Sequence, residues 1–135
     1  NEKGKIILIA RFGVEYIESK LPQLIKKINE NDMNVIWMCD PMHGNTYHND
    51  QGIKTRHFNT IVKELELYMK IHKLANTFPG GIHIEFTSED VTECLGGFQN
   101  IDDNALLKRY ETACDPRLNN QQSLELIFKL NDLMK

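Results

Sequence analysis

The stretch that decides the fold is Trp37-Met38-Cys39-Asp40-Pro41-Met42-His43-Gly44-Asn45-Thr46. An apolar run stops abruptly there in a polar segment that contains proline, glycine, a carboxylate and an imidazole. This pattern is typical of a buried parallel strand whose carboxyl end opens into a catalytic loop. Two later segments, 82–86 and 113–117, repeat the arrangement. We therefore expect scattered His, Glu and Asp side chains to meet at one rim of a sheet.

This stretch belongs to the second of three strand-then-helix units. Runs of β-branched and apolar residues predict strands at residues 5–10, 34–39 and 82–86. Apolar residues at helical spacing predict helices at residues 14–28, 58–72 and 120–134. The first helix should begin or bend near Pro22, and Pro79-Gly80-Gly81 should end the second. The alternating order predicts the α/β class, with a parallel sheet and helices packed outside it.

A long excursion, residues 87–119, separates the third strand from the last helix. A plain connector of about thirty residues is uncommon inside a compact domain, and such a length usually signals function. The middle of the excursion, residues 102–110, can form a short helix that carries Arg109. We expect this segment to present Cys114 and Asp115 to the rim.

The composition predicts one globular domain over residues 1–135. The chain is 41% hydrophobic and 26% charged, which supports a core and argues against disorder. Its net charge of -3 provides no field that would gather nucleic acid or an anionic membrane. No apolar run approaches a membrane span, the first residues do not resemble a signal peptide, and the three cysteines lack a Cys-x-x-Cys pair. These features predict a cytoplasmic location with reduced thiols.

The candidate metal ligands are His43, Glu85 and Asp115. One imidazole and two carboxylates suit Mn²⁺, Co²⁺, Fe²⁺ or Zn²⁺ better than Ca²⁺. Such an ion would act as a Lewis acid on a carbonyl oxygen. Each residue also has an ordinary structural explanation: a loop histidine bonded to backbone, a carboxylate paired with a lysine, and a turn former before Pro116.

Cationic side chains accompany these ligands. Arg11 follows the first strand and suits a phosphate or carboxylate, although it can also be an ordinary exposed arginine. Lys54 and Arg56 precede the second helix. Cations beside the free N–H groups of a helix start form an anion site, although the two side chains can also be an ordinary solvated basic pair. If Glu85 faces the interior of a barrel, His83 should face it too as a hydrogen-bonded histidine one layer below the site, and His72 should be a packing residue of the second helix.

Several strings strongly resemble the class II (plant-like) 3-deoxy-D-arabino-heptulosonate 7-phosphate (DAHP) synthases. The resemblance runs from about residue 5 to the C-terminus and preserves the order and spacing of the motifs. The matching strings are Cys39-Asp40-Pro41-Met42-His43-Gly44-Asn45-Thr46, Lys54-Thr55-Arg56, Gly80-Gly81-Ile82-His83-Ile84-Glu85, Val91-Thr92-Glu93-Cys94-Leu95-Gly96-Gly97, Arg109-Tyr110-Glu111-Thr112-Ala113-Cys114-Asp115-Pro116-Arg117-Leu118-Asn119 and Gln122-Ser123-Leu124-Glu125-Leu126.

This resemblance implies three consecutive βα units from the C-terminal portion of a (β/α)8 TIM barrel. It implies a metal-dependent transferase, 3-deoxy-7-phosphoheptulonate synthase. That enzyme condenses phosphoenolpyruvate with D-erythrose 4-phosphate and water to give DAHP and phosphate. This reaction is the first step of the shikimate pathway of aromatic amino acid biosynthesis. The implied location is the cytoplasm, or the plastid if the source is a plant.

The resemblance also implies a role for individual residues. His43, Glu85 and Asp115 match the metal ligands of the family, with Mn²⁺ or Co²⁺ as the expected ion and Fe²⁺ or Zn²⁺ as alternatives. Arg11 matches an arginine that binds phosphoenolpyruvate, whereas Lys54 and Arg56 match a basic pair on the erythrose 4-phosphate side. We count Asp40 as substrate-binding, or else as a residue that orients its loop. The expected catalytic residues are Arg11, His43, Lys54 and Glu85.

One departure from the family pattern is large. The fourth metal ligand of the family is a cysteine in a Cys-Ala-Glu context that this chain lacks, and three βα units cannot close a barrel. We therefore expect the chain to be the downstream part of something longer. It should be inactive alone and should form a homo-oligomer or associate with the missing barrel portion. The alternatives are a non-catalytic binding or assembly module and a different metal-dependent barrel lyase.

Overall fold

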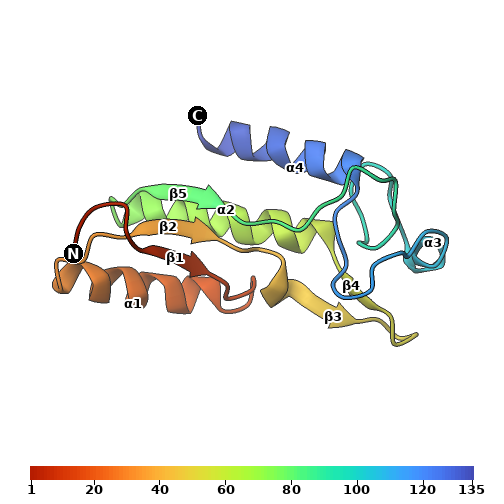
Figure 1. Cartoon of the computed structure of the whole chain (residues 1–135), viewed down its shortest axis with the longest axis horizontal. Coiled ribbons are helices and arrows are strands. Elements are labelled where there is room, and N and C mark those ends of the chain that lie inside the picture. The colour runs from red at the N-terminus through yellow and green to blue at the C-terminus, as the bar shows by residue number, and fades with distance from the viewer.

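A parallel three-stranded sheet forms the centre of the computed structural model, which describes residues 1–135 (Figure 1). Its strands lie in the order β1 (Ile7–Ala10), β2 (Ile36–Cys39) and β5 (Pro79–Ile82). The strands of this sheet therefore lie side by side in the order in which they follow along the chain. Strand-helix-strand connections produce this arrangement in a parallel sheet. The predicted α/β class with a parallel sheet is confirmed.

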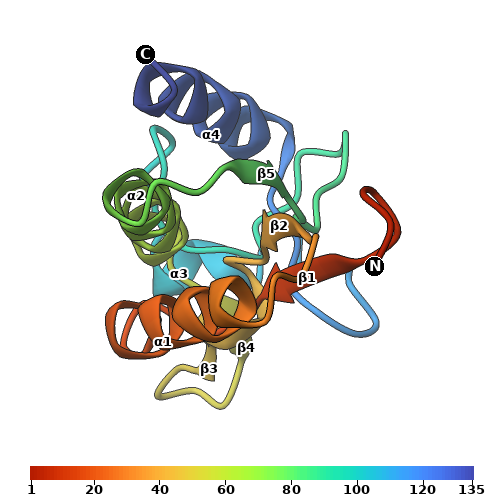
Figure 2. The same ribbon diagram turned by 90° about the vertical axis from the view of Figure 1, so that its left-hand side faces the viewer.

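Helices cover one face of this sheet. The helices α1 (Ile17–Glu30) and α2 (Phe58–Leu74) contact each other, and α4 (Asn120–Leu133) packs against α2. Figure 2 shows α1 and α2 on the same side of the strands. The core lies between the helices and the sheet and includes Trp37, Cys39 and Leu65. The opposite face is open, since Ile7 and Ile9 of β1 are 51% and 49% exposed.

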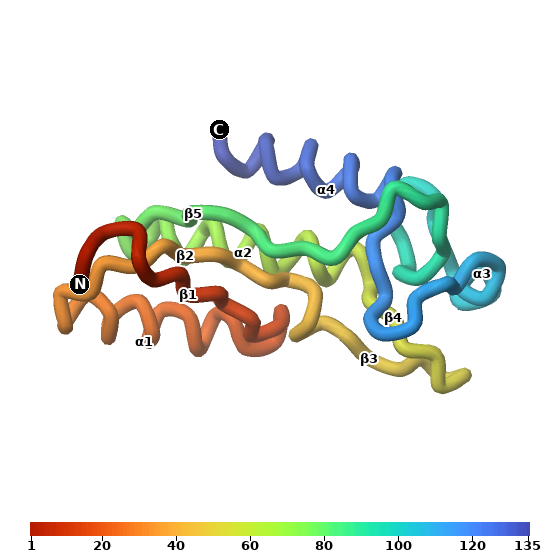
Figure 3. Tube along the Cα trace, viewed as in Figure 1, coloured from red at the N-terminus to blue at the C-terminus, as the bar shows by residue number.

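The carboxyl ends of the strands point toward one end of the molecule. The excursion after β5 lies at that end, together with the short helix α3 (Asp103–Leu106), as the trace in Figure 3 shows. Leu118 returns beside the continuation of β5: its N–H donates to the Glu85 carbonyl and its carbonyl accepts from the Thr87 N–H, both at 3.0 Å. The excursion is thereby tied to the rim that the sequence predicted as functional.

A small hairpin occupies the segment that the sequence predicts as a loop. A 3-10 turn (His43–Asn45) leads into β3 (Thr46–His48), which pairs in antiparallel fashion with β4 (Lys54–Arg56). The Asn49 side chain closes the hairpin by accepting the N–H groups of Gln51 and Ile53. The sequence predicts residues 40–56 only as a loop and does not indicate the hairpin within it, because the hairpin depends on this turn and not on apolar alternation.

The third strand lies earlier than predicted. The structure places β5 at Pro79–Ile82 and not at residues 82–86, so His83 and Glu85 follow the strand. Gly80 explains the shift, because a Cβ there would come within 2.8 Å of the Trp37 carbonyl oxygen. Glycine permits this close approach of β5 to β2. The His83 side chain is exposed in this chain, with its ring 6.4 Å from the His43 ring, and its interior position stays a prediction for a complete barrel.

The helices lie close to their predicted positions, but their ends differ from the prediction. α1 begins at Ile17, so Pro22 lies inside it and does not mark its start. α2 ends at Leu74, before the Pro-Gly-Gly string that was expected to end it. α3 is shorter than the predicted helix and leaves Arg109 beyond its end. α4 matches its predicted range; Leu126 is its buried apolar residue, whereas Leu124 and Ile127 are exposed.

His72 of α2 is fully buried, as the sequence predicted for a packing residue. Its ring lies 4.4 Å from the Tyr68 ring and 5.5 Å from the Trp37 ring, and its Nδ1 contacts the Thr77 hydroxyl at 2.8 Å. Its Nε2 has no hydrogen-bond partner. Burial in this aromatic environment lowers the pKa of His72 from 6.5 to about 4.

This burial predicts a loss of stability in acid. Because the folded state favours the neutral ring, the stabilisation is complete above about pH 6.5 and disappears as the pH falls through about 4. We expect urea unfolding of the full-length protein to show that the wild type loses on the order of 3 kcal/mol relative to His72→Phe over this window; the raised pKa of the buried Glu64 acts in the opposite direction but in both proteins. An equal acid dependence in the wild type and the variant would contradict this assignment.

Candidate metal centre

Three predicted ligands come together at the carboxyl end of the sheet. His43 lies in the turn after β2, Glu85 follows β5, and Asp115 lies in the excursion before α4. One donor atom from each residue lies within 4.8 Å of the others. His43 Nε2 is 3.4 Å from Glu85 Oε1 and 3.8 Å from Asp115 Oδ2. The structure therefore unites residues that are far apart in the sequence around one point.

The imidazole of His43 is oriented by Asp40. His43 Nδ1 lies 2.6 Å from Asp40 Oδ2, so a proton on Nδ1 leaves Nε2 as the free lone pair that faces the carboxylates. Asp40 Oδ1 accepts the backbone N–H groups of Met42 and His43 at 2.9 and 3.1 Å. Asp40 is 3% exposed, and both its oxygens are used by its own loop. These contacts support the orienting role over the substrate-binding role.

Each ligand carboxylate uses one oxygen for a cation and directs the other toward His43. Arg56 Nη1 is 2.6 Å from Glu85 Oε2, while Lys54 Nζ contacts Asp115 Oδ1. The hydrogen bond from Lys54 holds the pKa of Asp115 below its usual value. Glu85 Oε1 and Asp115 Oδ2 remain available beside His43 Nε2. Lys54 and Arg56 thus compensate the negative charge of the two carboxylates and leave the oxygens that face His43 free.

Arg56 is fully buried behind these ligands. Its Nε donates to the Thr46 hydroxyl at 2.8 Å, and Nη1 donates to the Pro116 carbonyl as well as to Glu85. Nη2 is buried without a partner. The guanidinium therefore joins the hairpin, the segment after β5 and the Asp115 loop. In this arrangement it has no exposed surface to offer a substrate, unlike Lys54, whose side chain is 38% exposed.

A second buried carboxylate, Glu93, supports the Asp115 loop. Its oxygens accept Arg117 Nε at 2.9 Å, Arg117 Nη2 at 2.7 Å and the Arg117 backbone N–H at 2.8 Å. Burial opposes ionisation of Glu93, but the hydrogen bonds from Arg117 prevail and lower its pKa. Sequence reasoning missed this residue. The signal was a glutamate between the apolar Val91 and Cys94, both of which are buried.

The loop that carries Arg11 follows β1 and contacts the turn that carries His43. The side chain is exposed and forms no hydrogen bond or ion pair in the structure. Two residues later, Gly13 has a φ of +78° and touches Gly44 of the His43 turn. A Cβ on Gly44 would lie 2.4 Å from the Gly13 nitrogen, so no side chain fits between the loops. This approach brings the backbone of the arginine loop against the ligand turn.

The family model of the class-II DAHP synthetase family matches residues 1–131. The chain belongs to this family. Phospho-2-dehydro-3-deoxyheptonate aldolase AroG of Mycolicibacterium smegmatis is 51% identical over 135 residues, which cover 100% of this chain and 29% of that protein. The phospho-2-dehydro-3-deoxyheptonate aldolase of Streptomyces coelicolor is 46% identical over 134 residues, which cover 99% of this chain and 30% of that protein.

A third relative has a different coverage. The phospho-2-dehydro-3-deoxyheptonate aldolase of Streptomyces lividans is 45% identical over 134 residues, which cover 99% of this chain and 91% of that sequence. The chain thus spans less than a third of the length of the first two relatives of the DAHP synthetase family. No helix of the chain is long and apolar enough to span a membrane.

The donor set fits a divalent metal ion in this DAHP synthetase chain. One imidazole nitrogen and two carboxylate oxygens converge, and the atoms behind them are already bonded to Asp40, Arg56 and Lys54. Such support fixes ligand orientation and is usual around metal-binding histidines and carboxylates. A mixed nitrogen and oxygen set suits Mn²⁺, Co²⁺, Fe²⁺ or Zn²⁺.

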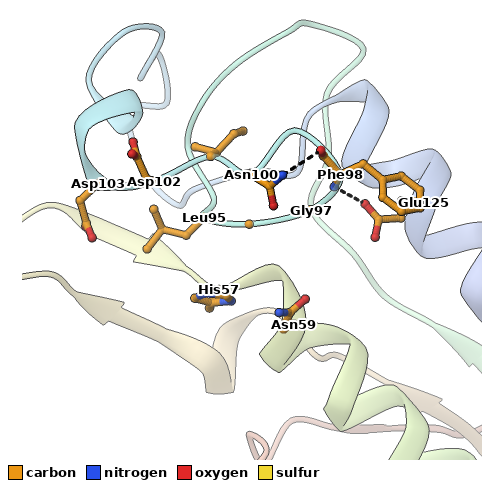
Figure 4. A pocket seen from close by; sticks show the side chains of 11 residues that line it. His57, Asn59, Leu95, Gly97, Phe98, Asn100, Asp102, Asp103 and Glu125 are labelled. Atoms are coloured by element: carbon orange, nitrogen blue, oxygen red, sulfur yellow. Dashed lines mark hydrogen bonds between the residues drawn. The ribbon is translucent and has the colours of Figure 1, made fainter.

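A separate cavity of about 500 Å³ lies between the start of α2, the excursion and α4 (Figure 4). None of the three ligands lines it. Glu125 of α4 accepts the Phe98 N–H at 2.8 Å, and this bond attaches the turn after Leu95 to the last helix. The cavity therefore lies where the excursion is attached to α4 in this DAHP synthetase chain. The charged groups that could act in catalysis lie elsewhere, around His43.

Proposed function

We propose that this chain contributes the metal-binding sector of the active site of a 3-deoxy-7-phosphoheptulonate synthase. The reaction joins phosphoenolpyruvate to D-erythrose 4-phosphate, consumes water and releases phosphate. The observation that carries the proposal is the convergence of His43 Nε2, Glu85 Oε1 and Asp115 Oδ2, each held from behind by another side chain. Membership in the DAHP synthetase family supports the choice of reaction.

Each side chain of the site has a separate role in this proposal. His43, Glu85 and Asp115 would hold a divalent ion, Mn²⁺ or Co²⁺ in the first instance. Bound there, the ion supplies Lewis acidity toward the aldehyde oxygen of erythrose 4-phosphate. Arg11 offers its free guanidinium fork to phosphoenolpyruvate. Lys54 keeps Asp115 ionised and offers a partly exposed ammonium on the erythrose 4-phosphate side.

The reaction requires the two substrates to be held in a fixed position relative to each other. The enol carbon of phosphoenolpyruvate attacks the aldehyde carbon of erythrose 4-phosphate, and the new C–C bond leaves a cationic carbon that carries the phosphate ester. Water adds at this carbon, loses a proton, and the phosphate departs to leave the ketone of DAHP. Fixing both phosphorylated substrates lowers the entropic part of the barrier. The cations needed for this are local, so the net charge of -3 is no obstacle.

The fold would be completed by further βα units. Three parallel strands with helices on one side match a sector of a (β/α)8 barrel. The exposed Ile7 and Ile9 of β1 lie on the face that would become the barrel interior. The first two relatives are more than three times as long as the matched segment, which supplies enough chain for the remaining units. We propose that this closure, within one chain or between copies, is required for activity.

Arg56 is proposed as a positioning residue in place of the predicted erythrose 4-phosphate contact. Arg56→Lys keeps the charge but loses the planar fork that joins Thr46, Glu85 and Pro116. We expect it to weaken Mn²⁺ binding by about tenfold, in the range found when support of a metal ligand is lost. Calorimetry on the full-length protein measures this, with the surface substitution Arg109→Lys as control. Equal affinity in both variants would refute the role.

The test of the proposed function is an assay of the full-length protein with both substrates and Mn²⁺. We expect phosphoenolpyruvate to disappear only when erythrose 4-phosphate is present, with one phosphate released per DAHP formed. A chelator should stop the reaction and added Mn²⁺ should restore it. Metal binding without any turnover would favour the non-catalytic assembly module, which the open apolar face of β1 also suits.

A further inference from the structure

Glu64 of α2 is a buried carboxylate for which the structure provides no cation. Its side chain is 0% exposed. Oε1 accepts the Gly13 N–H at 3.0 Å, and Oε2 accepts Asn45 Nδ2 at 2.6 Å. Burial raises the pKa of Glu64 to about 7, against the opposing effect of these hydrogen bonds. A group that is costly to bury is expected to make contacts that the fold or the site uses.

Both contacts of Glu64 lead to loops of the candidate site. Gly13 lies two residues after Arg11, and Asn45 lies two residues after His43. Asn45 extends the network, since its Oδ1 accepts the Val14 N–H at 3.0 Å and its Nδ2 also donates to the Pro41 carbonyl at 2.8 Å. One carboxylate on α2 thereby holds the backbones of the two loops together.

The arginine loop depends on this network more than the ligand turn does. The His43 ring has its own support from Asp40, whereas the Arg11 side chain has no partner in the structure. The placement of Arg11 therefore depends on the backbone of its loop, which Glu64 holds at Gly13. A misplacement of about 1 Å far from the reacting atoms can reduce a rate by about a hundredfold.

We propose that Glu64 is a positioning residue that fixes the Arg11 loop relative to the His43 turn. This inference rests on the proposed function, in which Arg11 binds phosphoenolpyruvate and His43 holds the metal ion. Glu64 would thus keep the phosphoenolpyruvate anion in register with the aldehyde held at the metal. It touches neither substrate and acts only through Gly13 and Asn45.

Glu64→Gln is the informative substitution because it preserves shape and removes the charge. The amide oxygen can still accept the Gly13 N–H, but the amide nitrogen then meets Asn45 Nδ2, and two donors face each other. Adding Asn45→Asp restores the contact between the two side chains with its polarity reversed, because the new amide on α2 donates to the new carboxylate, which can still accept the Val14 N–H. The carboxylate cannot donate to the Pro41 carbonyl as Asn45 does, so the restoration is partial. The matched control is Glu66→Gln, which lies on the same helix and whose carboxylate pairs with Lys63 at the surface.

The experiment compares these variants in the full-length protein by steady-state kinetics, Mn²⁺ titration and amide hydrogen exchange. For Glu64→Gln we expect a loss of tenfold or more in kcat/KM for phosphoenolpyruvate, with Mn²⁺ affinity within threefold of wild type. Hydrogen exchange should accelerate at residues 13–14 and 43–45 and not along α2. The double variant should recover part of both effects, since the contact between the two side chains returns while the bond to the Pro41 carbonyl is lost, and Glu66→Gln should stay within twofold of wild type.

The outcomes separate this inference from the proposed function. Kinetics and exchange of Glu64→Gln equal to those of Glu66→Gln would overturn the positioning role and leave the function intact. Faster exchange throughout α2 would also overturn it, because Glu64 would then be a general stability residue. An inactive wild type would refute the function instead, and the exchange data would still decide whether Glu64 holds the two loops together.

Discussion

Replacing His43 with alanine is expected to weaken Mn²⁺ binding tenfold or more and to reduce kcat/KM by about 10³. Tenfold in affinity corresponds to about 1.4 kcal/mol, and a Lewis acid contributes several kcal/mol to stabilising the transition state. His43 Nε2 is the one nitrogen among the three converging donors. Glu85→Ala should have a comparable effect, since it removes Oε1 and also leaves the buried Arg56 without its carboxylate. Metal titration and steady-state kinetics of the full-length protein measure both effects.

The matched control for this prediction is His48→Ala. His48 is the last residue of β3, is exposed and lies in the same segment of the chain, but it is not among the converging donors. Its substitution should leave Mn²⁺ affinity and kcat/KM within twofold of wild type. If His43→Ala and Glu85→Ala bind Mn²⁺ as tightly as His48→Ala does, neither residue is a metal ligand.

Gly44→Ala is expected to impair the site without removing any functional side chain. The new Cβ would lie 2.4 Å from the Gly13 nitrogen and 2.9 Å from the Phe12 carbonyl carbon. Both are backbone atoms, so one loop must move. Overpacking of this kind typically costs about 1–3 kcal/mol, and the displacement separates the Arg11 loop from the His43 turn. We expect kcat/KM for phosphoenolpyruvate to fall by about a hundredfold.

Gly81→Ala provides the comparison for this effect. A Cβ at Gly81 would meet only the Met38 side chain at 3.5 Å, an ordinary van der Waals contact. Thermal unfolding and kinetics of the two variants should therefore differ clearly, with Gly81→Ala near wild type. Equal behaviour would mean that the close contact between Gly13 and Gly44 does not matter for the site.

The sequence predicted the α/β architecture because β2 and the amphipathic helices α1 and α2 carry local patterns. It misplaced β5 because the strand passes over Gly80, and glycine is normally a sign of a turn. It missed the hairpin because β3 and β4 are short and polar, and only the Asn49 turn indicated them. Local periodicity finds elements with an apolar face and fails where one backbone contact determines the geometry.

In the candidate site, too, the sequence predicted some features and missed others. The three converging donors could be predicted since each occurs near a strand end or in a rim loop, where parallel sheets collect functional groups. The supporting contacts could not be predicted, because Glu64 reaches Gly13 across 51 positions and Arg56 reaches Glu85 across 29. A signal for Glu64 was present, as it shares the buried face of α2 with Ile61, Leu65 and Tyr68. A carboxylate on such a face indicates a buried hydrogen-bond network.

The measurement that tests the central claim most directly is anomalous diffraction at the manganese edge from crystals of the full-length protein soaked in Mn²⁺. We expect one strong peak within bonding distance of His43 Nε2, Glu85 Oε1 and Asp115 Oδ2, with Asp40 still bonded to His43 Nδ1. Manganese bound elsewhere, with these three side chains free of metal, would contradict the assignment of this rim as the metal centre.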